Sequence, residues 1–290
     1  MPLENSGIID PHLHLFDLQQ GNYAWLKASQ APFWPDKNKI ARNFSEHDLV
    51  LPNDMYLQGF VHIEAGFDNQ CPWREIDWLE TQCRVPFKSV ACAELGSDNF
   101  ADVIQQLSQR SSVVGIRHIL DDNADEILNH PLIDYHFAAL ERLAWSFDAQ
   151  LNLRNIRGAE ALLKLSHRFP AVAIIINHAG LPPALAQSNQ HQIWADNLQK
   201  LSEQANVAIK MSGWEMTNRQ WTRHFMLESM ALCLRLFGND RVMLASNFPL
   251  CTFSHSYADL WQIYQTELVL PASTWRQLSA DNASRWYQFN

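Results

Sequence analysis

The feature that most constrains the fold is an alternation, repeated along the whole chain, between short apolar runs and longer segments with helical spacing. Each run has the length of a strand and is rich in β-branched residues, as buried β-strands are. Eight such runs occur in the 290 residues. The predicted strands span residues 7–16, 57–65, 88–95, 113–120, 149–155, 172–179, 207–214 and 241–249.

The segments between these runs carry the spacing of amphipathic helices. In Ala159, Leu162 and Leu163 the small or apolar side chains recur at i, i+3 and i+4, which gives one buried stripe. Gly238 follows another such segment at a position typical of a helix C-terminus. The predicted helices span residues 74–85, 100–111, 131–147, 159–169, 192–205, 219–237 and 274–289.

Strands that alternate with helices pair in parallel through right-handed crossovers, and eight such units close a (β/α)8 TIM barrel. The alternative is an open doubly wound sheet, but the first turn lacks the G-x-G-x-x-G pattern of its nucleotide-binding members. We therefore predict an α/β protein with one TIM-barrel domain over residues 1–290. A long loop over 19–53, which contains Trp25 and Trp34, is expected to form a lid after the first strand.

Composition narrows the range of partners. The formal net charge of −9 disfavours nucleic acid and anionic membranes as partners, because both require concentrated Lys and Arg. The five cysteines form no C-x-x-C pair, and neither a signal peptide nor an 18-residue apolar span is present. We expect a cytoplasmic protein that acts on a small-molecule substrate. The sequence carries no signal for an oligomeric state.

Polar side chains follow almost every predicted strand at its C-terminal end, where a TIM barrel places its catalytic groups. Strand ends also reach water, so each position taken alone is equally compatible with a solvated side chain. The polar residues at strand ends are His12, His14, His62, Glu64, Glu94, Arg117, His118, Arg154, Asn155, Asn177, His178, Lys210, Ser212, Glu215, Ser246 and Asn247.

Three of the histidines lie on apolar strands and call for a common explanation. Side chains alternate along a strand, so Asp10, His12 and His14 are expected on one face and Ile9 on the other. Buried imidazoles serve as metal ligands or as hydrogen-bonded polar groups. Together with His178, the pair predicts either a metal site or a substrate site.

Two other sets have a structural alternative to a role in catalysis. His62 and Glu64 are read more readily as a buried, hydrogen-bonded pair that supports the site than as catalytic groups. Lys210 is equally compatible with a salt bridge inside the barrel and with a substrate contact.

Five motifs, in order, resemble those of the amidohydrolase superfamily (amidohydrolase family 2). The resemblance is greatest to its lactonase-rich branch of predicted metal-dependent TIM-barrel hydrolases, which includes sugar-acid and pyrone dicarboxylate lactonases. It spans nearly the whole chain, and residues 281–287 resemble that branch's closing helix. The motifs are Asp10-Pro11-His12-Leu13-His14, Gly115-Ile116-Arg117-His118, Ile176-Asn177-His178-Ala179-Gly180-Leu181-Pro182, Lys210-Met211-Ser212-Gly213 and Ala245-Ser246-Asn247-Phe248-Pro249.

The resemblance implies that His12, His14 and His178 bind one divalent metal, with zinc the expected ion. In the family pattern an Asp on the eighth strand is a ligand and the general base, but this chain has Asn247 there. An amide does not take a proton from water as a carboxylate does. Function without a metal is therefore the open alternative, and a binuclear centre is not expected, because the fifth predicted strand has no His.

The leading hypothesis is hydrolysis of a sugar-acid or carboxylated lactone by activated water. We assign catalytic roles to His178, Asn247 and Glu64, with Glu215 and the other histidines as alternative bases. Cationic and imidazole groups would bind the substrate or its oxyanion. These substrate-binding candidates are Arg117, His118, Arg154 and Lys210. Two alternatives stay open: a metal-dependent decarboxylase of the same superfamily, and a non-catalytic barrel that has lost its base.

Overall fold

The computed structural model describes residues 6–184 and 188–289, and its eight strands form one parallel sheet in the order β1 to β8. The ring closes between β1 and the segment after β8, where the His14 backbone N–H donates to the Phe248 carbonyl over 2.7 Å. This is the predicted TIM barrel. The strands are β1 (Ser6–Leu13), β2 (Met55–Ile63), β3 (Phe87–Cys92), β4 (Val113–Ile119), β5 (Ser146–Gln150), β6 (Ile174–Ile176), β7 (Val207–Met211) and β8 (Val242–Leu244).

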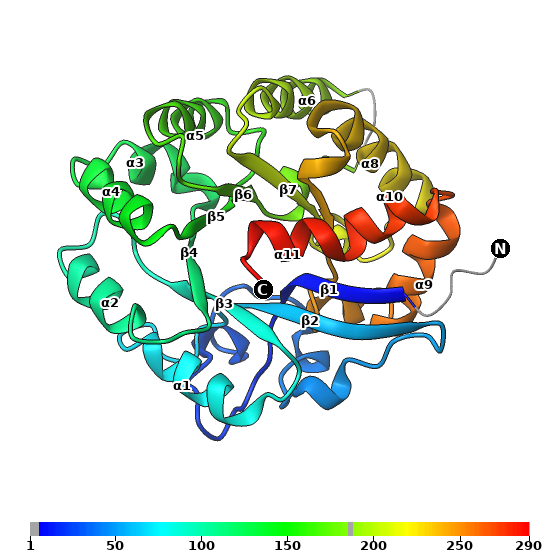
Figure 1. The fold of residues 1–290 in the computed structure, drawn as a ribbon, viewed down its shortest axis with the longest axis horizontal. Helices are drawn as coiled ribbons and strands as arrows, with labels where there is room; N and C mark the ends of the chain where they lie inside the picture. The colour runs from blue at the N-terminus through cyan, green and yellow to red at the C-terminus, as the bar shows by residue number, and fades with distance from the viewer. Residues whose placement is uncertain (1–5, 185–187, 290) are drawn as a thin grey trace.

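Helices surround this ring of strands (Figure 1). The helix over 257–267 is absent from the sequence prediction, although Ser256 caps its N-terminus by accepting from the Asp259 backbone N–H. The helices are α1 (Trp73–Gln82), α2 (Phe100–Leu107), α3 (Ala124–Leu128), α4 (Ile133–Leu143), α5 (Ile156–Arg168), α6 (Asn189–Ser202), α7 (Trp214–Thr217), α8 (Arg223–Phe237), α9 (Tyr257–Glu267), α10 (Ala272–Arg276) and α11 (Asn282–Trp286).

The fifth strand lies earlier in the sequence than predicted. We expected a helix to residue 147 and a strand over 149–155, but α4 ends at Leu143 and β5 begins at Ser146. Ala144 adopts a left-handed conformation that ends the helix. The prediction was wrong here because Asp148, a buried acid within β5, breaks the apolar pattern of a strand.

The C-terminal helices close one end of the barrel. Helices α10 and α11 are joined by a π-helical turn over Gln277–Asp281 and cross the barrel in Figure 1. Ala280, Ala283 and Tyr287 from this segment pack against interior side chains such as Ile9 and Met243. The polar strand ends therefore face the opposite end of the barrel.

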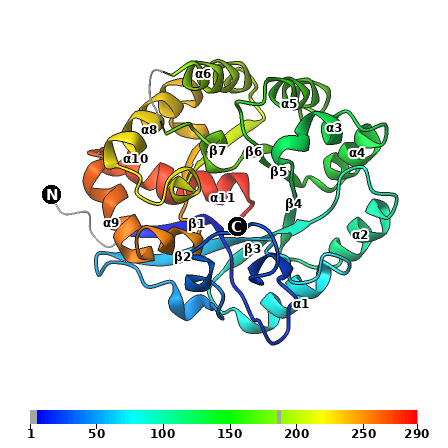
Figure 2. The ribbon, with the colours of Figure 1, turned by 180° about the vertical axis from the view of Figure 1, so that it is seen from behind.

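The loop between β1 and β2 lies at that opposite end and is the long loop that the sequence predicted; its role as a lid stays a prediction. It contains three 3₁₀ turns, at Ala24–Leu26, Lys37–Lys39 and Glu46–Asp48, and it is blue in the reverse view (Figure 2). An ion pair of 3.1 Å links its Asp36 to Arg219, which follows α7.

Within the described ranges, 6–184 and 188–289, no helix is long and apolar enough to cross a membrane.

Candidate active site

The structure brings together the three histidines that the sequence singled out. The ring centroids of His12 and His14 lie 5.2 Å apart, and those of His12 and His178 lie 4.5 Å apart. All three side chains are at most 5% exposed. The end of β1 and the segment after β6 therefore form one imidazole cluster.

A register shift in β1 changes which residues share a face. The β1–β2 pairing is irregular between Asp10 and Leu13, so the strict alternation is lost. Ile9 packs in the barrel interior, and His12 faces the same interior, toward Lys210. The expectation that Ile9 lies opposite His12 was therefore wrong. Asp10 accepts from the His12 backbone N–H, and burial raises the pKa of Asp10 to about 6.

A buried chain of polar groups supports His12 from below. Lys210 Nζ lies 3.3 Å from His12 Nδ1 and 2.6 Å from Asp148 Oδ2. The Tyr287 hydroxyl of the closing segment donates to Asp148 over 2.9 Å. Lys210 thus forms the salt bridge that the sequence left open, and its contact with a substrate stays a prediction. Burial lowers the pKa of Lys210 to about 8 against the opposing effect of Asp148.

Their hydrogen bonds give His12 and His14 opposite tautomers. An ammonium group only donates, so Lys210 leaves His12 Nδ1 as the acceptor and places the ring proton on Nε2. A carbonyl only accepts, so His14 Nδ1 donates to Ile63 O over 2.7 Å and its Nε2 keeps a lone pair. His12 Nε2 is buried and has no hydrogen-bond partner among the described residues.

Burial holds the pKa of both rings well below the usual range, so both are neutral at neutral pH. The positive charge of Lys210 adds to this effect at His12, and that of Arg117 adds to it at His14. The pair therefore presents one N–H donor, on His12, and one nitrogen lone pair, on His14, in rings whose centroids lie 5.2 Å apart.

His178 sits in a strained turn after β6. His178, Ala179 and Leu181 all have positive φ angles, which is uncommon outside glycine. The ring packs so closely on Gly213 that a Cβ there would lie 2.5 Å from the His178 ring. His178 Nδ1 lies 3.0 Å from Ser212 Oγ, and burial lowers the pKa of His178 to about 3.

Arg117 and Glu64 form a buried ion pair beside the histidines. Arg117 Nε donates to Glu64 Oε1 over 2.9 Å, and Nη2 donates to the Glu64 carbonyl over 2.7 Å. Both side chains are under 10% exposed. His62 has a different partner from the one expected, because its Nε2 lies 3.0 Å from Glu75 of α1. Glu64 thus holds Arg117, and its catalytic role stays a prediction.

Asn247 also has an acidic neighbour. Its Nδ2 donates to Glu215 Oε1 over 2.6 Å, and both side chains are buried. Burial raises the pKa of Glu215 to about 7. The Asn247 backbone has a φ of 59°, a conformation that Asn tolerates better than most residues.

The remaining two predicted substrate-binding residues make other contacts. His118 Nδ1 accepts from the Leu95 backbone N–H, and its side chain lines a hollow between the loops after β3 and β4. Arg154 Nε donates to Asn152 Oδ1 in the segment after β5. No contact between these two and the imidazole cluster is recorded in the described part of the chain. Their roles stay predictions.

The donors do not fit the expected zinc ion as they are arranged. A metal ligand must present a lone pair, whereas His12 presents an N–H while Lys210 donates to it. The charges of Arg117 and Lys210, close enough to lower the pKa of His178, also oppose a cation. Across residues 6–184 and 188–289, no group of three or more His, Cys, Asp or Glu is placed to hold a metal ion.

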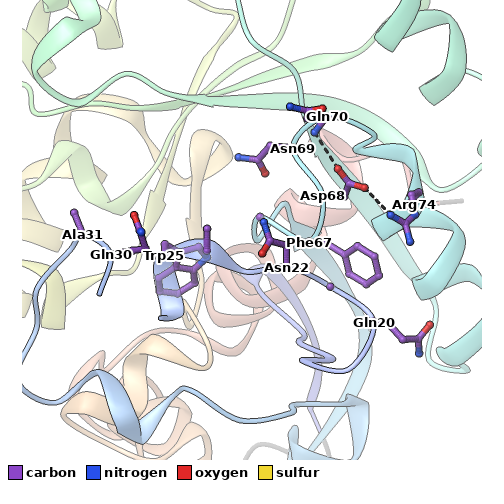
Figure 3. Close-up of a pocket in the computed structure, with 13 residues that line it drawn as sticks. Gln20, Asn22, Trp25, Gln30, Ala31, Phe67, Asp68, Asn69, Gln70 and Arg74 are labelled. Carbon is purple, nitrogen blue, oxygen red and sulfur yellow. Dashed lines mark hydrogen bonds and ion pairs between the residues drawn. The ribbon is translucent and has the colours of Figure 1, made fainter. Parts of the chain in front are cut away.

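A cavity of about 780 Å³ lies beside the lid (Figure 3). It is lined by residues of the segment 20–31 on one side and of the loop after β2 on the other, and Asp68 pairs with Arg74 of α1. Trp25 lines it and donates from Nε1 to the Ala65 carbonyl, directly after Glu64. The three histidines do not line this cavity, and their side chains are buried.

Sequence reasoning missed two supporting residues. Asp148 fell between a predicted helix and a predicted strand, and Tyr287 was placed only on an amphipathic helix. The sequence does contain a clue to Asp148, because a lysine buried in a barrel strand, such as Lys210, needs an acidic partner.

Asn177, noted only as polar, has a fully buried amide without a hydrogen-bond partner among the described residues.

The profile of the family described as "Amidohydrolase" matches residues 9–289. The uncharacterized protein y4mH of Sinorhizobium fredii is 30% identical over 301 residues, which cover 99% of this chain and 100% of the relative. The L-fucono-1,5-lactonase of Burkholderia ambifaria is 26% identical over 264 residues, covering 87% of this chain and 83% of that enzyme.

Solved structures show the same fold. An amidohydrolase from Burkholderia multivorans, crystallised with bound zinc, has a TM-score of 0.82 at 19% identity. The match covers 98% of this chain and 99% of that protein.

Proposed function

Because this chain belongs to the amidohydrolase family, we propose that it hydrolyses a small lactone at the polar end of its barrel. The L-fucono-1,5-lactonase relatives support a cyclic ester of a sugar acid as the substrate class. The observation that carries the proposal is the pair of opposite tautomers at His12 and His14. Ester hydrolysis needs both functions: a donor for the carbonyl oxygen and an acceptor for the proton of water.

His12 supplies the donor in this proposal. When water adds to the lactone carbonyl, negative charge develops on the carbonyl oxygen, and a preorganised N–H in a buried site stabilises that charge. Lys210 keeps the ring proton on His12 Nε2 and adds a nearby positive charge. Arg117, fixed by Glu64, supplies a second cation for the oxyanion or for a substrate carboxylate.

His14 supplies the acceptor. Its Nε2 lone pair takes the proton of the attacking water as the new carbon–oxygen bond forms. The ring carbon–oxygen bond then breaks, and the proton passes to the leaving alkoxide, which yields a hydroxy acid. The low pKa of His14 keeps the ring neutral and makes it a weak base, which suits an activated ester rather than an amide. His178 and Asn177 are proposed to bind substrate oxygens beside this pair.

The test is a panel of sugar-acid and carboxylated lactones, followed with a pH indicator on chelator-treated and zinc-supplemented protein whose metal content is measured. We expect acid release in both samples. Release of carbon dioxide would favour the decarboxylase alternative, and no turnover would favour the non-catalytic barrel. Activity that appears only with stoichiometric zinc would contradict the proposed metal-free mechanism.

A matched pair of variants tests the role of His12. His12→Phe keeps a ring but removes the donor, and we expect kcat to fall about 100-fold or more, as for loss of one oxyanion donor. His224→Ala, on a side chain 80% exposed on α8, is the control and should retain wild-type kcat. Equal kcat in the two variants would remove His12 from the mechanism.

A further inference from the structure

Glu215 and Asn247 form a buried pair at the ends of neighbouring strands. Glu215 lies in α7, directly after β7, and Asn247 follows β8 by three residues. The 2.6 Å bond from Asn247 Nδ2 to Glu215 Oε1 joins side chains that are 1% and 2% exposed. Neither residue takes a chemical role in the mechanism above.

The backbone around this pair is held from several directions. Trp214, the neighbour of Glu215, donates from Nε1 to the Tyr264 hydroxyl over 2.7 Å. That hydroxyl lies 3.0 Å from the carbonyl of Met211 and 3.1 Å from that of Ala245, so α9 ties the ends of β7 and β8 together. The Asn247 backbone N–H donates to the His12 carbonyl over 2.8 Å. The pair is therefore fixed relative to the imidazole cluster.

The chemistry of the two groups decides which way the amide faces. Where Glu215 is ionised, its carboxylate only accepts, so the NH₂ of Asn247 must turn toward it. The carboxamide oxygen then points away from Glu215 and takes no part in the bond between the two side chains. If residue 215 were neutral and able to donate, the amide could turn over and present its NH₂ instead.

We propose that Glu215 is a positioning residue for the candidate active site: it holds the Asn247 amide so that Oδ1 is the acceptor offered to the attacking water. Asn247 then orients a water proton without removing it, and the proton itself passes to His14. Glu215 also keeps a carboxylate one hydrogen bond away from the position where the family pattern has its acid. This inference rests on the proposed lactone hydrolysis.

Three variants test the arrangement. Glu215→Gln can face Asn247 with either end of its amide, so we expect kcat to fall at least tenfold with KM changed less than threefold. Asn247→Asp places two carboxylates within hydrogen-bonding distance, which share one proton, and we expect a comparable loss. The double variant exchanges the two groups, since the amide introduced at position 215 can donate to the carboxylate introduced at position 247. We expect its kcat to be at least tenfold above either single variant.

A purely structural role predicts a different result. In that case Glu215→Gln changes the urea midpoint and leaves kcat unchanged, or the double variant recovers stability without recovering kcat. Either result overturns the proposal. Circular dichroism and urea unfolding of all three variants separate a folding defect from a loss of positioning.

A second measurement does not depend on turnover. In ¹⁵N-labelled wild-type protein at pH 8, we expect a side-chain proton of Asn247 well downfield, because it donates to a carboxylate over a short distance. The signal should move upfield in Glu215→Gln. If the wild-type protein shows this signal but hydrolyses no lactone, the proposed function is refuted and the arrangement of Glu215 and Asn247 stands. If the protein hydrolyses lactones but the signal does not move in Glu215→Gln, the positioning role of Glu215 is refuted.

Discussion

At the scale of single residues, Glu215 is an acid whose surroundings favour its neutral form. Burial is the main cause of its raised pKa of about 7, and the hydrogen bond from Asn247 and the charge of Arg219 oppose the shift. The unfolded chain releases the proton near pH 4.5, whereas the folded protein keeps it to about pH 7. Between these values the folded state binds more protons, so its stability falls as the pH rises.

The Glu215→Gln variant should therefore gain stability relative to wild type as the pH rises. A shift of this size corresponds to roughly 3 kcal/mol at full ionisation. We expect the difference in the free energy of unfolding, variant minus wild type, to grow by a sizeable part of that value between pH 5 and 8. Urea unfolding at several pH values measures it. A difference that stays constant over this range would show that the pKa of Glu215 is not raised in the folded state.

The sequence predicted the imidazole cluster but only part of its surroundings. His12, His14 and His178 were found because imidazoles on apolar strands are rare and the motifs are ordered. Their tautomers depend on Ile63 and Lys210, contacts that strand-end positions alone do not define. Glu75 was not predicted as the partner of His62, because it lies on a helix outside the barrel.

At the scale of elements, the lid is tied to the barrel through one arginine. Arg219 pairs with Asp36, stacks on Phe253 at 3.9 Å and on Trp34 at 5.0 Å, and donates to the Glu215 carbonyl. The aromatic residues of the loop predicted that it packs against the rest of the protein. The sequence did not predict that it does so through Arg219, because that contact depends on where the fold places the residues after α7. The imidazole side chains are at most 5% exposed, so we expect substrate entry to require movement of the loops at this end of the barrel.

Asp36→Asn should loosen the lid without unfolding the barrel. The ion pair is partly exposed, so we expect a cost of up to about 1 kcal/mol in local stability. Hydrogen exchange measured by mass spectrometry should then be up to roughly fivefold faster in peptides covering residues 27–43. Asp98→Asn, on an exposed residue before α2, is the control. Unchanged exchange in the Asp36 variant would mean that the ion pair does not hold the lid.

At the scale of the whole molecule, the alternation of strands and helices was sufficient to predict the barrel, because eight parallel units have few ways to close. The closure of one end of the barrel by the segment from α10 to α11 was not predicted. An amphipathic helix at residues 274–289 shows an apolar stripe, but the stripe alone does not reveal that it enters the barrel.

Tyr287→Phe tests how much this closing segment contributes to the stability of the barrel. The substitution leaves Asp148 with Lys210 but without the phenol, and loss of a buried hydrogen bond to a charged group costs about 1.5–3 kcal/mol. We expect a loss in this range in the free energy of unfolding by urea. Tyr135→Phe, on a side chain 63% exposed, is the control. Equal stability in the two variants would show that the Tyr287 hydroxyl adds nothing to the folded state.

The contact between Tyr287 and Asp148 also has a consequence for biosynthesis. Tyr287 is linked to His12 through only two side chains, Asp148 and Lys210, although the two residues lie near opposite ends of the sequence. A nascent chain that has reached residue 280 contains every strand and every candidate catalytic residue, yet the support beneath His12 is incomplete. The support beneath His12 can therefore form only after the segment that contains Tyr287 has been synthesised.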